Sequence, residues 1–265
     1  MRIVPISEHV GAAVIDIDLA SSIDQTTAEL LREALARHVI LVIREQSFEP
    51  SQLLAVVRVL GEPMRQNYAQ FNLPEFPDIG IINYDDVQTP ADTWHTDTTN
   101  RETPPMATVL YAITVPSHGG DTSVANMRAA YAALPDSIKR DLDGLETVNT
   151  FDGQFAVTEQ ERQDFGTPVH HPLVRTHPVT GEKALYFHIL KTGHIPGKTP
   201  AASRLFLEEL LQLAIKPEFV YRHQWQAGDL VIVDNRSAMH RVHDDYDRTE
   251  QRVLHRIVLK GDRPV

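Results

Sequence analysis

The most constraining feature of the sequence is a series of short, β-branched and aromatic runs that recurs along the chain after Gly61. Each run has the length and composition of a sheet strand. The runs cover residues 78–83, 107–113, 172–177, 184–188, 219–225, 230–234 and 252–260. Turn signals lie between them, such as Gly119-Gly120-Asp121, Thr180-Gly181 and Ala227-Gly228-Asp229. Short strands separated by such turns predict a barrel or a jelly roll.

Helical patterns precede and interrupt these runs. Apolar residues recur at helical spacing in residues 26–36, 51–60, 127–134 and 203–215, and a buried-strand pattern occupies residues 39–44. No repeat, low-complexity stretch or linker divides the chain, so the sequence predicts one domain over residues 1–265. The expected fold class is therefore mainly β, with helices surrounding the strands.

Charge and composition narrow the class of partner. The 36 acidic and 25 basic residues give a formal net charge of -11, which disfavours binding to the phosphates of nucleic acid. Cysteine is absent, as suits a reducing cytoplasm. Glu8, Asp16 and Asp18 interrupt the N-terminal region where a signal peptide needs an apolar run, and no segment approaches the roughly 20 apolar residues of a membrane span. These features predict a soluble, cytoplasmic protein without a membrane partner.

The segment TWHTDT at residues 93–98 predicts half of a metal site. In an extended segment residues i and i+2 share a face, so His95 and Asp97 are expected to point to the same side. Together they would supply two ligands of a two-histidine, one-carboxylate triad, which suits Fe(II) oxygenases. A histidine and an aspartate at this spacing are also common by chance, and the alternative is an ion pair in a solvated loop.

The remaining ligand must come from a distant histidine. His240 follows a strand-like run and a turn and is the candidate, while His243 and His255 are alternatives. Near the C-terminus, Arg252 and Arg256 fall on one face of a predicted strand and His255 on the other. The two arginines indicate either a solvated sheet edge or buried guanidinium groups that bind carboxylates.

Several long segments, taken in order, carry a resemblance to a known family. They are WHTD at 94–97, GGDT at 119–122, HPLVRTHPVTGEKALYF at 171–187, WQAGDLVIVDNRSAMH at 225–240 and RVLHRIVLKGDRP at 252–264. With them the chain resembles the Fe(II)- and 2-oxoglutarate-dependent dioxygenases of the taurine dioxygenase and phenoxyacetate dioxygenase group, from about Ile6 to the C-terminus. The fold that this resemblance implies is a double-stranded β-helix, or jelly roll.

The resemblance also implies roles for individual residues. His95, Asp97 and His240 would bind iron as the catalytic centre, while Thr122 and Arg252 would hold the distal carboxylate of 2-oxoglutarate. Arg256 falls where relatives bind the sulfonate or carboxylate of their substrates. The other expected substrate-binding residues are Thr98, Tyr186, Phe155 and Tyr68. For Phe155 and Tyr186, ordinary core packing is an equal alternative.

Two segments depart from the family pattern. The stretch between His240 and Arg252 is one residue longer than in the taurine enzyme pattern, and residues 62–75 do not align clearly with it. The first departure bears on the placement of Arg252, and the second bears on the substrate pocket.

The implied activity is hydroxylation of a small anionic organic substrate, with succinate and CO2 as the products formed from 2-oxoglutarate and O2. The expected substrate is a sulfonate, an alkyl sulfate, or an aryloxy, amino or carboxylic acid. Asp97 argues against a halogenase, because halogenases of this type carry a small residue at that position. A zinc-type hydrolase and a catalytically inactive binding protein on the same barrel are the alternatives. Relatives commonly form dimers or tetramers, so we expect a homo-oligomer.

Overall fold

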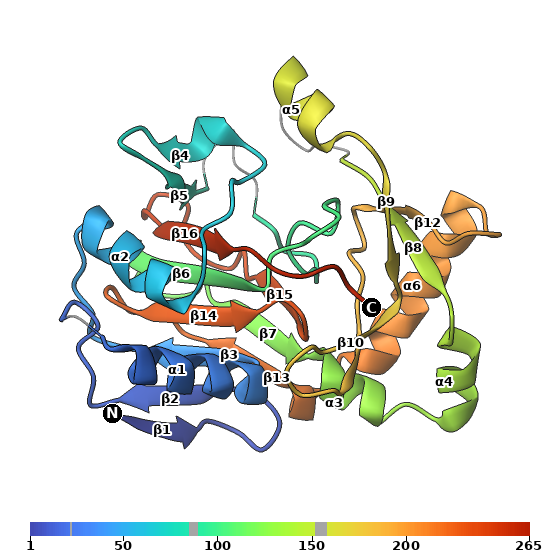
Figure 1. The fold of residues 1–265 in the computed structure, drawn as a ribbon, viewed down its shortest axis with the longest axis horizontal. Coiled ribbons are helices and arrows are strands. Elements are labelled where there is room, and N and C mark those ends of the chain that lie inside the picture. The colour runs from blue at the N-terminus through green and yellow to red at the C-terminus, as the bar shows by residue number, and fades with distance from the viewer. Residues whose placement is uncertain (22, 85–89, 152–157) are drawn as a thin grey trace.

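An eight-stranded sheet runs through the computed structural model, which describes residues 1–21, 23–84, 90–151 and 158–265 (Figure 1). The strand order is β1-β2-β3-β14-β6-β16-β5-β4, and of these neighbouring pairs only β2 and β3 are parallel. In that order the strands span Arg2–Pro5, Ala12–Ile15, Ile40–Ile43, Leu230–Asp234, Ala107–Thr114, Val253–Leu259, Phe76–Asn83 and Asn72–Leu73. Strand β14 is buried throughout, as expected for a strand paired on both sides.

A three-stranded antiparallel sheet packs against this one. It has the order β13-β7-β15, with β13 at Val220–His223, β7 at Thr122–Asn126 and β15 at Ala238–Val242. Apolar side chains of β6 and β14 share one core cluster with side chains of β7 and β15. This contact places β7 and β15 beside the large sheet.

Two smaller sheets complete the strands. One has the order β12-β8-β9, with bounds Thr192–His194, Glu146–Asn149 and Val169–Pro172. The other pairs β10 at Val174–Thr176 with β11 at Lys183–Leu185. They lie on the opposite side of the molecule from β1 and β2 (Figure 1).

The longer helices pack in two groups, one on the large sheet and one around a second core. Helices α1 (Gln25–His38) and α2 (Pro50–Leu60) pack on the large sheet, while α3 (Met127–Ala132) and α6 (Pro200–Ala214) pack around a second core near β11. The shorter helices are α4 (Asp136–Leu142), α5 (Glu159–Phe165), η1 (Ala69–Phe71) and η2 (Pro217–Phe219). Within the described ranges, none of the helices combines the length and the apolar character needed to cross a membrane.

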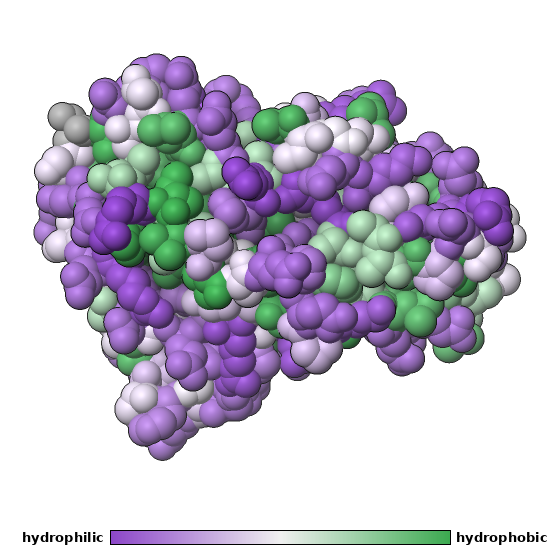
Figure 2. Space-filling view, turned by 90° about the horizontal axis from the view of Figure 1, so that it is seen from below, coloured by the Kyte–Doolittle hydropathy of each residue, from purple (hydrophilic) through white to green (hydrophobic). Residues whose placement is uncertain are grey.

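The face of the molecule drawn in Figure 2 is mixed in hydropathy. Hydrophilic side chains cover much of the face in Figure 2, where apolar side chains form separate patches among them.

The predicted fold class, mainly β with surrounding helices, is confirmed. The run at 230–234 is a strand with the predicted bounds, and the predicted helix at 203–215 instead begins at Pro200. There the Thr199 side chain caps the helix by accepting a hydrogen bond from the amide of Ala202.

Three strand predictions are wrong in extent. The run at 172–177 belongs to two strands in different sheets, because β9 ends at Pro172, which has no N–H for continued pairing, and β10 begins at Val174. The run at 184–188 leaves its strand after Leu185, and the run at 219–225 is a strand only as far as His223. The sequence prediction also missed the short strands β1, β2, β4 and β12. It missed β7, β8 and β15 as well, whose polar residues mask the strand pattern.

Candidate active site

Backbone pairing places His95 and His240 side by side. His240 lies in β15, and His95 forms an isolated antiparallel bridge with it. The His95 amide donates to the His240 carbonyl at 3.0 Å, and the His240 amide donates to the His95 carbonyl at 2.7 Å. The two imidazole centroids are therefore only 4.3 Å apart, although the residues come from distant parts of the chain.

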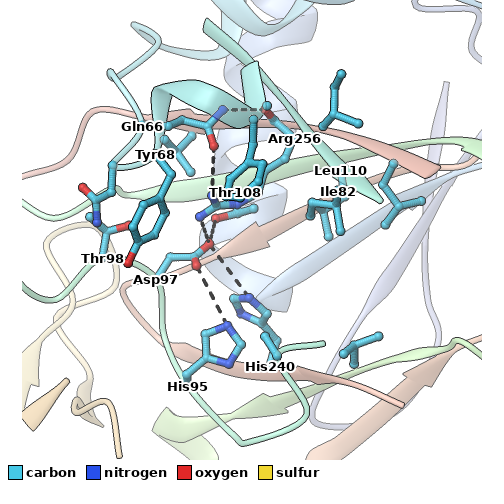
Figure 3. A pocket seen from close by; sticks show the side chains of 18 of the residues that line it. Gln66, Tyr68, Ile82, His95, Asp97, Thr98, Thr108, Leu110, His240 and Arg256 are labelled. Atoms are coloured by element: carbon cyan, nitrogen blue, oxygen red, sulfur yellow. Dashed lines mark hydrogen bonds and ion pairs between the residues drawn. The ribbon is translucent and has the colours of Figure 1, made fainter. Parts of the chain in front are cut away.

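Asp97 completes the group of potential ligands. One ligand atom from each of His95, Asp97 and His240 lies within 4.8 Å of the others. His95 Nε2 is 4.0 Å from one carboxylate oxygen of Asp97, and His240 Nε2 is 3.9 Å from the other (Figure 3). The expected extended segment is not continuous, because a turn begins at Asp97 and Thr98 has a φ of 55°. The three side chains nevertheless converge.

The protonation of these groups suits metal binding. His95 Nδ1 lies 2.7 Å from the Thr93 carbonyl, so it donates there and leaves Nε2 with a free lone pair. Burial lowers the pKa of His95 and lowers that of His240 to about 3, so both imidazoles are neutral near pH 7. Two neutral imidazoles and one carboxylate form the donor set of an Fe(II) facial triad.

A buried hydrogen-bond network holds the Asp97 carboxylate. Asp97 Oδ2 accepts from Arg256 Nη2 at 2.8 Å and from the Thr108 hydroxyl at 2.5 Å. Arg256 Nη1 in turn donates to Gln66 Oε1 at 2.9 Å, so Asp97 lies between Arg256 and the two imidazoles (Figure 3). Burial raises the pKa of Asp97, but the positive charge of Arg256 and the neighbouring imidazoles outweigh burial and hold it well below its usual range. Oδ1 remains directed toward His95.

Thr108 and Gln66 were missed by the sequence analysis. Thr108 is a buried hydroxyl within the otherwise apolar strand β6, and that polar interruption was the available signal. Gln66 falls in the segment 62–75 that resembles no clear family pattern.

A second polar group lies at the start of β16, where Arg252 directly precedes the strand. Arg252 is only 2% exposed; its Nε donates to the Gly120 carbonyl at 2.8 Å, and its Nη2 lies 3.4 Å from the Thr122 hydroxyl. Thr122 Oγ1 also accepts from Trp225 Nε1 at 3.0 Å. Arg252 Nη1 is buried without a hydrogen-bond partner among the described residues. A buried guanidinium with an unsatisfied donor favours a bound carboxylate.

Gly120 is required for this arrangement. Its φ is +66°, and a Cβ there would lie 3.1 Å from Arg252 Cδ. Any larger residue would therefore combine backbone strain with a close contact to the guanidinium stem.

One cavity of about 230 Å³ connects the two groups. His95, Asp97, His240, Arg252 and Thr122 all line it. Its apolar wall is formed by Ile82, Leu110, Val242 and Leu254. The cavity therefore brings the predicted metal ligands and the predicted 2-oxoglutarate residues to one space.

Only some of the predicted substrate-binding residues line the cavity. Arg256, Thr98 and Tyr68 line the cavity, although Arg256 binds Asp97 and Gln66. Tyr186 does not line it; the ring packs 5.0 Å from the Arg175 guanidinium carbon. Phe155 lies outside the described residues.

The alternative histidines lie elsewhere. His243 Nε2 is 2.8 Å from the Ser123 hydroxyl, outside the group of potential ligands. His255 is absent from the cavity lining, while Arg252 and Arg256 belong to it, so the predicted alternation of this strand is confirmed.

Comparisons with known proteins agree with this site. The family model described as "Taurine catabolism dioxygenase TauD, TfdA family" matches residues 2–258. The chain is 31% identical to the alpha-ketoglutarate-dependent 2,4-dichlorophenoxyacetate dioxygenase of Cupriavidus pinatubonensis (strain JMP 134 / LMG 1197), covering 98% of both chains. It is 32% identical to the alpha-ketoglutarate-dependent sulfate ester dioxygenase of Pseudomonas putida, covering 98% of this chain and 90% of that one.

Solved structures show the same similarity. A putative alpha-ketoglutarate-dependent taurine dioxygenase from Burkholderia xenovorans has a TM-score of 0.86 and 32% identity, covering 100% of this chain and 94% of that chain. The structure of AAD-2 in complex with Mn(II) and N-oxalylglycine has a TM-score of 0.85 and 30% identity, covering 99% and 98% of the two chains.

Proposed function

The chain belongs to the taurine catabolism dioxygenase TauD, TfdA family, and from this premise we propose that it hydroxylates a small anionic organic substrate. It is a 2-oxoglutarate-dependent dioxygenase whose cofactors are Fe(II), 2-oxoglutarate and O2. The observation that carries the proposal is one cavity that joins a His-Asp-His group to a buried arginine whose Nη1 has no hydrogen-bond partner among the described residues. A zinc-type hydrolase would have no need of that second group.

His95, Asp97 and His240 would hold the metal. Arg256 and the Thr108 hydroxyl fix Oδ2 of Asp97 and so keep the carboxylate oriented toward the imidazoles. When bound, Fe(II) supplies the O2 chemistry that couples decarboxylation of 2-oxoglutarate to hydroxylation of a C–H bond.

Arg252 and Thr122 would receive the distal carboxylate of 2-oxoglutarate. The guanidinium offers a buried N–H donor, and a carboxylate there would pair with a cation that burial otherwise disfavours. The apolar wall of the cavity would contact the methylene carbons and exclude water from them.

We also propose that the core is a double-stranded β-helix within a single domain, residues 1–265. In support, residues of β6 and β16 line the cavity together with residues of β7 and β15, so both sheets contribute to its wall. The cytoplasmic location and the homo-oligomeric state remain predictions from the sequence.

The proposed substrates are aryloxy acids, sulfate esters, sulfonates and other small carboxylic acids. The relatives named for dichlorophenoxyacetate and sulfate esters support this range. Tyr68, Thr98 and Arg256 line the cavity and stay the proposed substrate-side residues, while Tyr186 and Phe155 stay predictions.

Succinate release tests the proposal. The purified protein would be incubated with Fe(II), ascorbate, O2 and 2-oxoglutarate, with each acid of that panel in turn. At least one acid should stimulate succinate formation, and Asp97→Ala should abolish it because a metal ligand is lost. Asp92→Ala, which removes an exposed carboxylate from the same segment, is the control and should retain activity. Undiminished succinate formation by Asp97→Ala would contradict the metal assignment.

A further inference from the structure

We propose that Trp225 is a positioning residue that directs the hydroxyl proton of Thr122 toward the distal carboxylate of 2-oxoglutarate. The inference rests on the proposed function and adds a residue that does not itself touch the cosubstrate. Trp225 is not among the described residues that line the cavity, whereas Thr122 and Arg252 are. Trp225 therefore acts on the cosubstrate through its contact with Thr122.

The buried indole of Trp225 requires an acceptor, and Thr122 supplies it. Trp225 Nε1 donates a hydrogen bond to Thr122 Oγ1 at 3.0 Å, and both side chains are buried. An indole N–H can only donate, and a buried N–H without an acceptor destabilises the fold. One lone pair of the Thr122 hydroxyl oxygen is therefore directed at Trp225.

A second donor approaches the same hydroxyl oxygen. Arg252 Nη2 lies 3.4 Å from Thr122 Oγ1, and a guanidinium group also carries donors only. Both hydrogen bonds of this hydroxyl to described residues are thus accepted, which leaves its own proton for an acceptor in the cavity. Arg252 Nη1 also has no partner among the described residues. Two donors are therefore available to the two oxygens of one carboxylate.

The surrounding structure holds the indole in place. Strand β13 pairs with β7 so that His223 lies opposite Thr122, and Trp225 follows two residues later. The rings of His223 and Trp225 pack edge to face, with centroids 4.5 Å apart. His223 Nε2 lies 3.0 Å from Asp229 Oδ2, and the same oxygen accepts from the Gln226 amide at 2.9 Å. These contacts fix both the ring that packs on the indole and the backbone next to Trp225.

A double-mutant cycle on 2-oxoglutarate binding tests this role. Anaerobic calorimetry on the Fe(II)-loaded protein would measure the Kd of 2-oxoglutarate in the wild type, Trp225→Phe, Thr122→Val and the double variant. Phenylalanine keeps an aromatic ring but has no N–H, and valine keeps the shape of threonine but has no hydroxyl. Trp225→Phe should raise the Kd about three- to tenfold, and Thr122→Val should raise it at least about tenfold.

The decisive comparison is the effect of Trp225→Phe when the hydroxyl is already absent. In the Thr122→Val background, Trp225→Phe should change the Kd by less than about twofold, because Trp225 acts only through that hydroxyl. A purely structural role of the indole would raise the Kd by the same factor in both backgrounds. An undiminished effect in the double variant therefore overturns the proposal, and so does an unchanged Kd in Trp225→Phe alone.

Tyr111→Phe is the matched control for lost stability. The Tyr111 hydroxyl also makes buried hydrogen bonds, accepting from the Phe48 amide at 3.1 Å and donating to the Gln46 carbonyl at 3.2 Å. Tyr111 is not among the described residues that line the cavity. This variant should lose stability in denaturant titrations but keep the Kd of 2-oxoglutarate within about twofold of the wild-type value. An increase in Kd as large as that of Trp225→Phe would overturn the proposal, because lost stability would then explain both.

Failure of the positioning role and failure of the proposed function give different results. If the wild-type protein binds 2-oxoglutarate in an Fe(II)-dependent manner and Trp225→Phe binds it equally well, only the role of Trp225 is overturned. If the wild-type protein does not bind 2-oxoglutarate with Fe(II) present, the proposed function fails and the role of Trp225 fails with it.

Discussion

Replacement of Arg252 by methionine should weaken the binding of 2-oxoglutarate while leaving the unfolding free energy of the protein almost unchanged. The guanidinium is almost completely buried, with Nε bound to the Gly120 carbonyl and Nη1 lacking a partner among the described residues. In the proposed complex the distal carboxylate of 2-oxoglutarate supplies that partner. Methionine keeps an apolar side chain of similar length but removes both the charge and the donors.

The expected loss of affinity follows from the hydrogen bonds involved. A hydrogen bond to a charged group contributes about 1.5–3 kcal/mol, so losing two costs about 3–6 kcal/mol. With about 1.4 kcal/mol for each tenfold change, the Kd of 2-oxoglutarate should rise at least about a hundredfold. The fold itself should lose little, because the variant removes a buried unsatisfied donor together with the hydrogen bond to Gly120 and the longer one to Thr122.

Calorimetry and thermal unfolding, both anaerobic and with Fe(II), would measure these two effects. Without 2-oxoglutarate, the unfolding free energy of Arg252→Met should lie within about 1 kcal/mol of the wild-type value. With 2-oxoglutarate at one hundred times its wild-type Kd, the wild-type protein should gain about 2.7 kcal/mol and the variant much less. Arg248→Met, in the exposed preceding loop, should behave as wild type. An unchanged 2-oxoglutarate Kd in Arg252→Met would refute the assignment.

Three further substitutions test other parts of the structure. Thr108→Val removes one of the donors that orient Asp97 and should weaken Fe(II) binding about tenfold in a chelator competition, whereas equal affinity would show that the hydroxyl is dispensable. Asp234→Asn should lower the unfolding free energy by about 3 kcal/mol in denaturant titrations, because it leaves buried Arg236 without its carboxylate. Burial raises the pKa of Asp234, but the hydrogen bonds from Arg236 outweigh burial and lower this pKa below its ordinary value of 3.8. The ionised carboxylate therefore stabilises the fold above pH 3.8, and this stabilisation should decline as the pH falls below 3.8. The decline should be seen in the wild-type protein but not in Asp234→Asn. Gly228→Ala should cost about 1–3 kcal/mol in the same titrations, since φ is +86° and a Cβ would lie 2.7 Å from a facing carbonyl oxygen; wild-type stability would contradict this.

The sequence predicted best those strands whose residues all lie in the same surroundings, such as a strand that is buried along its whole length. Residues 230–234 form a continuous apolar run because β14 is buried and paired on both sides, and that run has the predicted bounds. Strand β15 was missed because Met239, His240 and Arg241 face different surroundings, and His240 faces a cavity rather than a core. Polar residues inside a strand thus weakened the strand signal at the position where function required them.

Within the site, the sequence indicated which residues converge but not what each one contacts. The alternation predicted for residues 252–260 correctly placed Arg252 and Arg256 on one side, although β16 itself begins at Val253. It could not show that Arg256 reaches Asp97, because that contact depends on the distance between segments far apart in the chain. The turn at Asp97, with Thr98 at positive φ, was equally hidden, since Thr has no special preference for that conformation.

If His95 and His240 bind iron as proposed, the backbone bridge between them would link iron acquisition to the completion of folding. The two residues belong to opposite halves of the chain, and we expect a contact of such large separation to form late because of the loop-closure entropy. Before they pair, a nascent or partly folded chain would offer the metal only the local pair of proposed ligands, His95 and Asp97, and would lack the third. Iron retention would thus distinguish chains that have finished folding from those that have not.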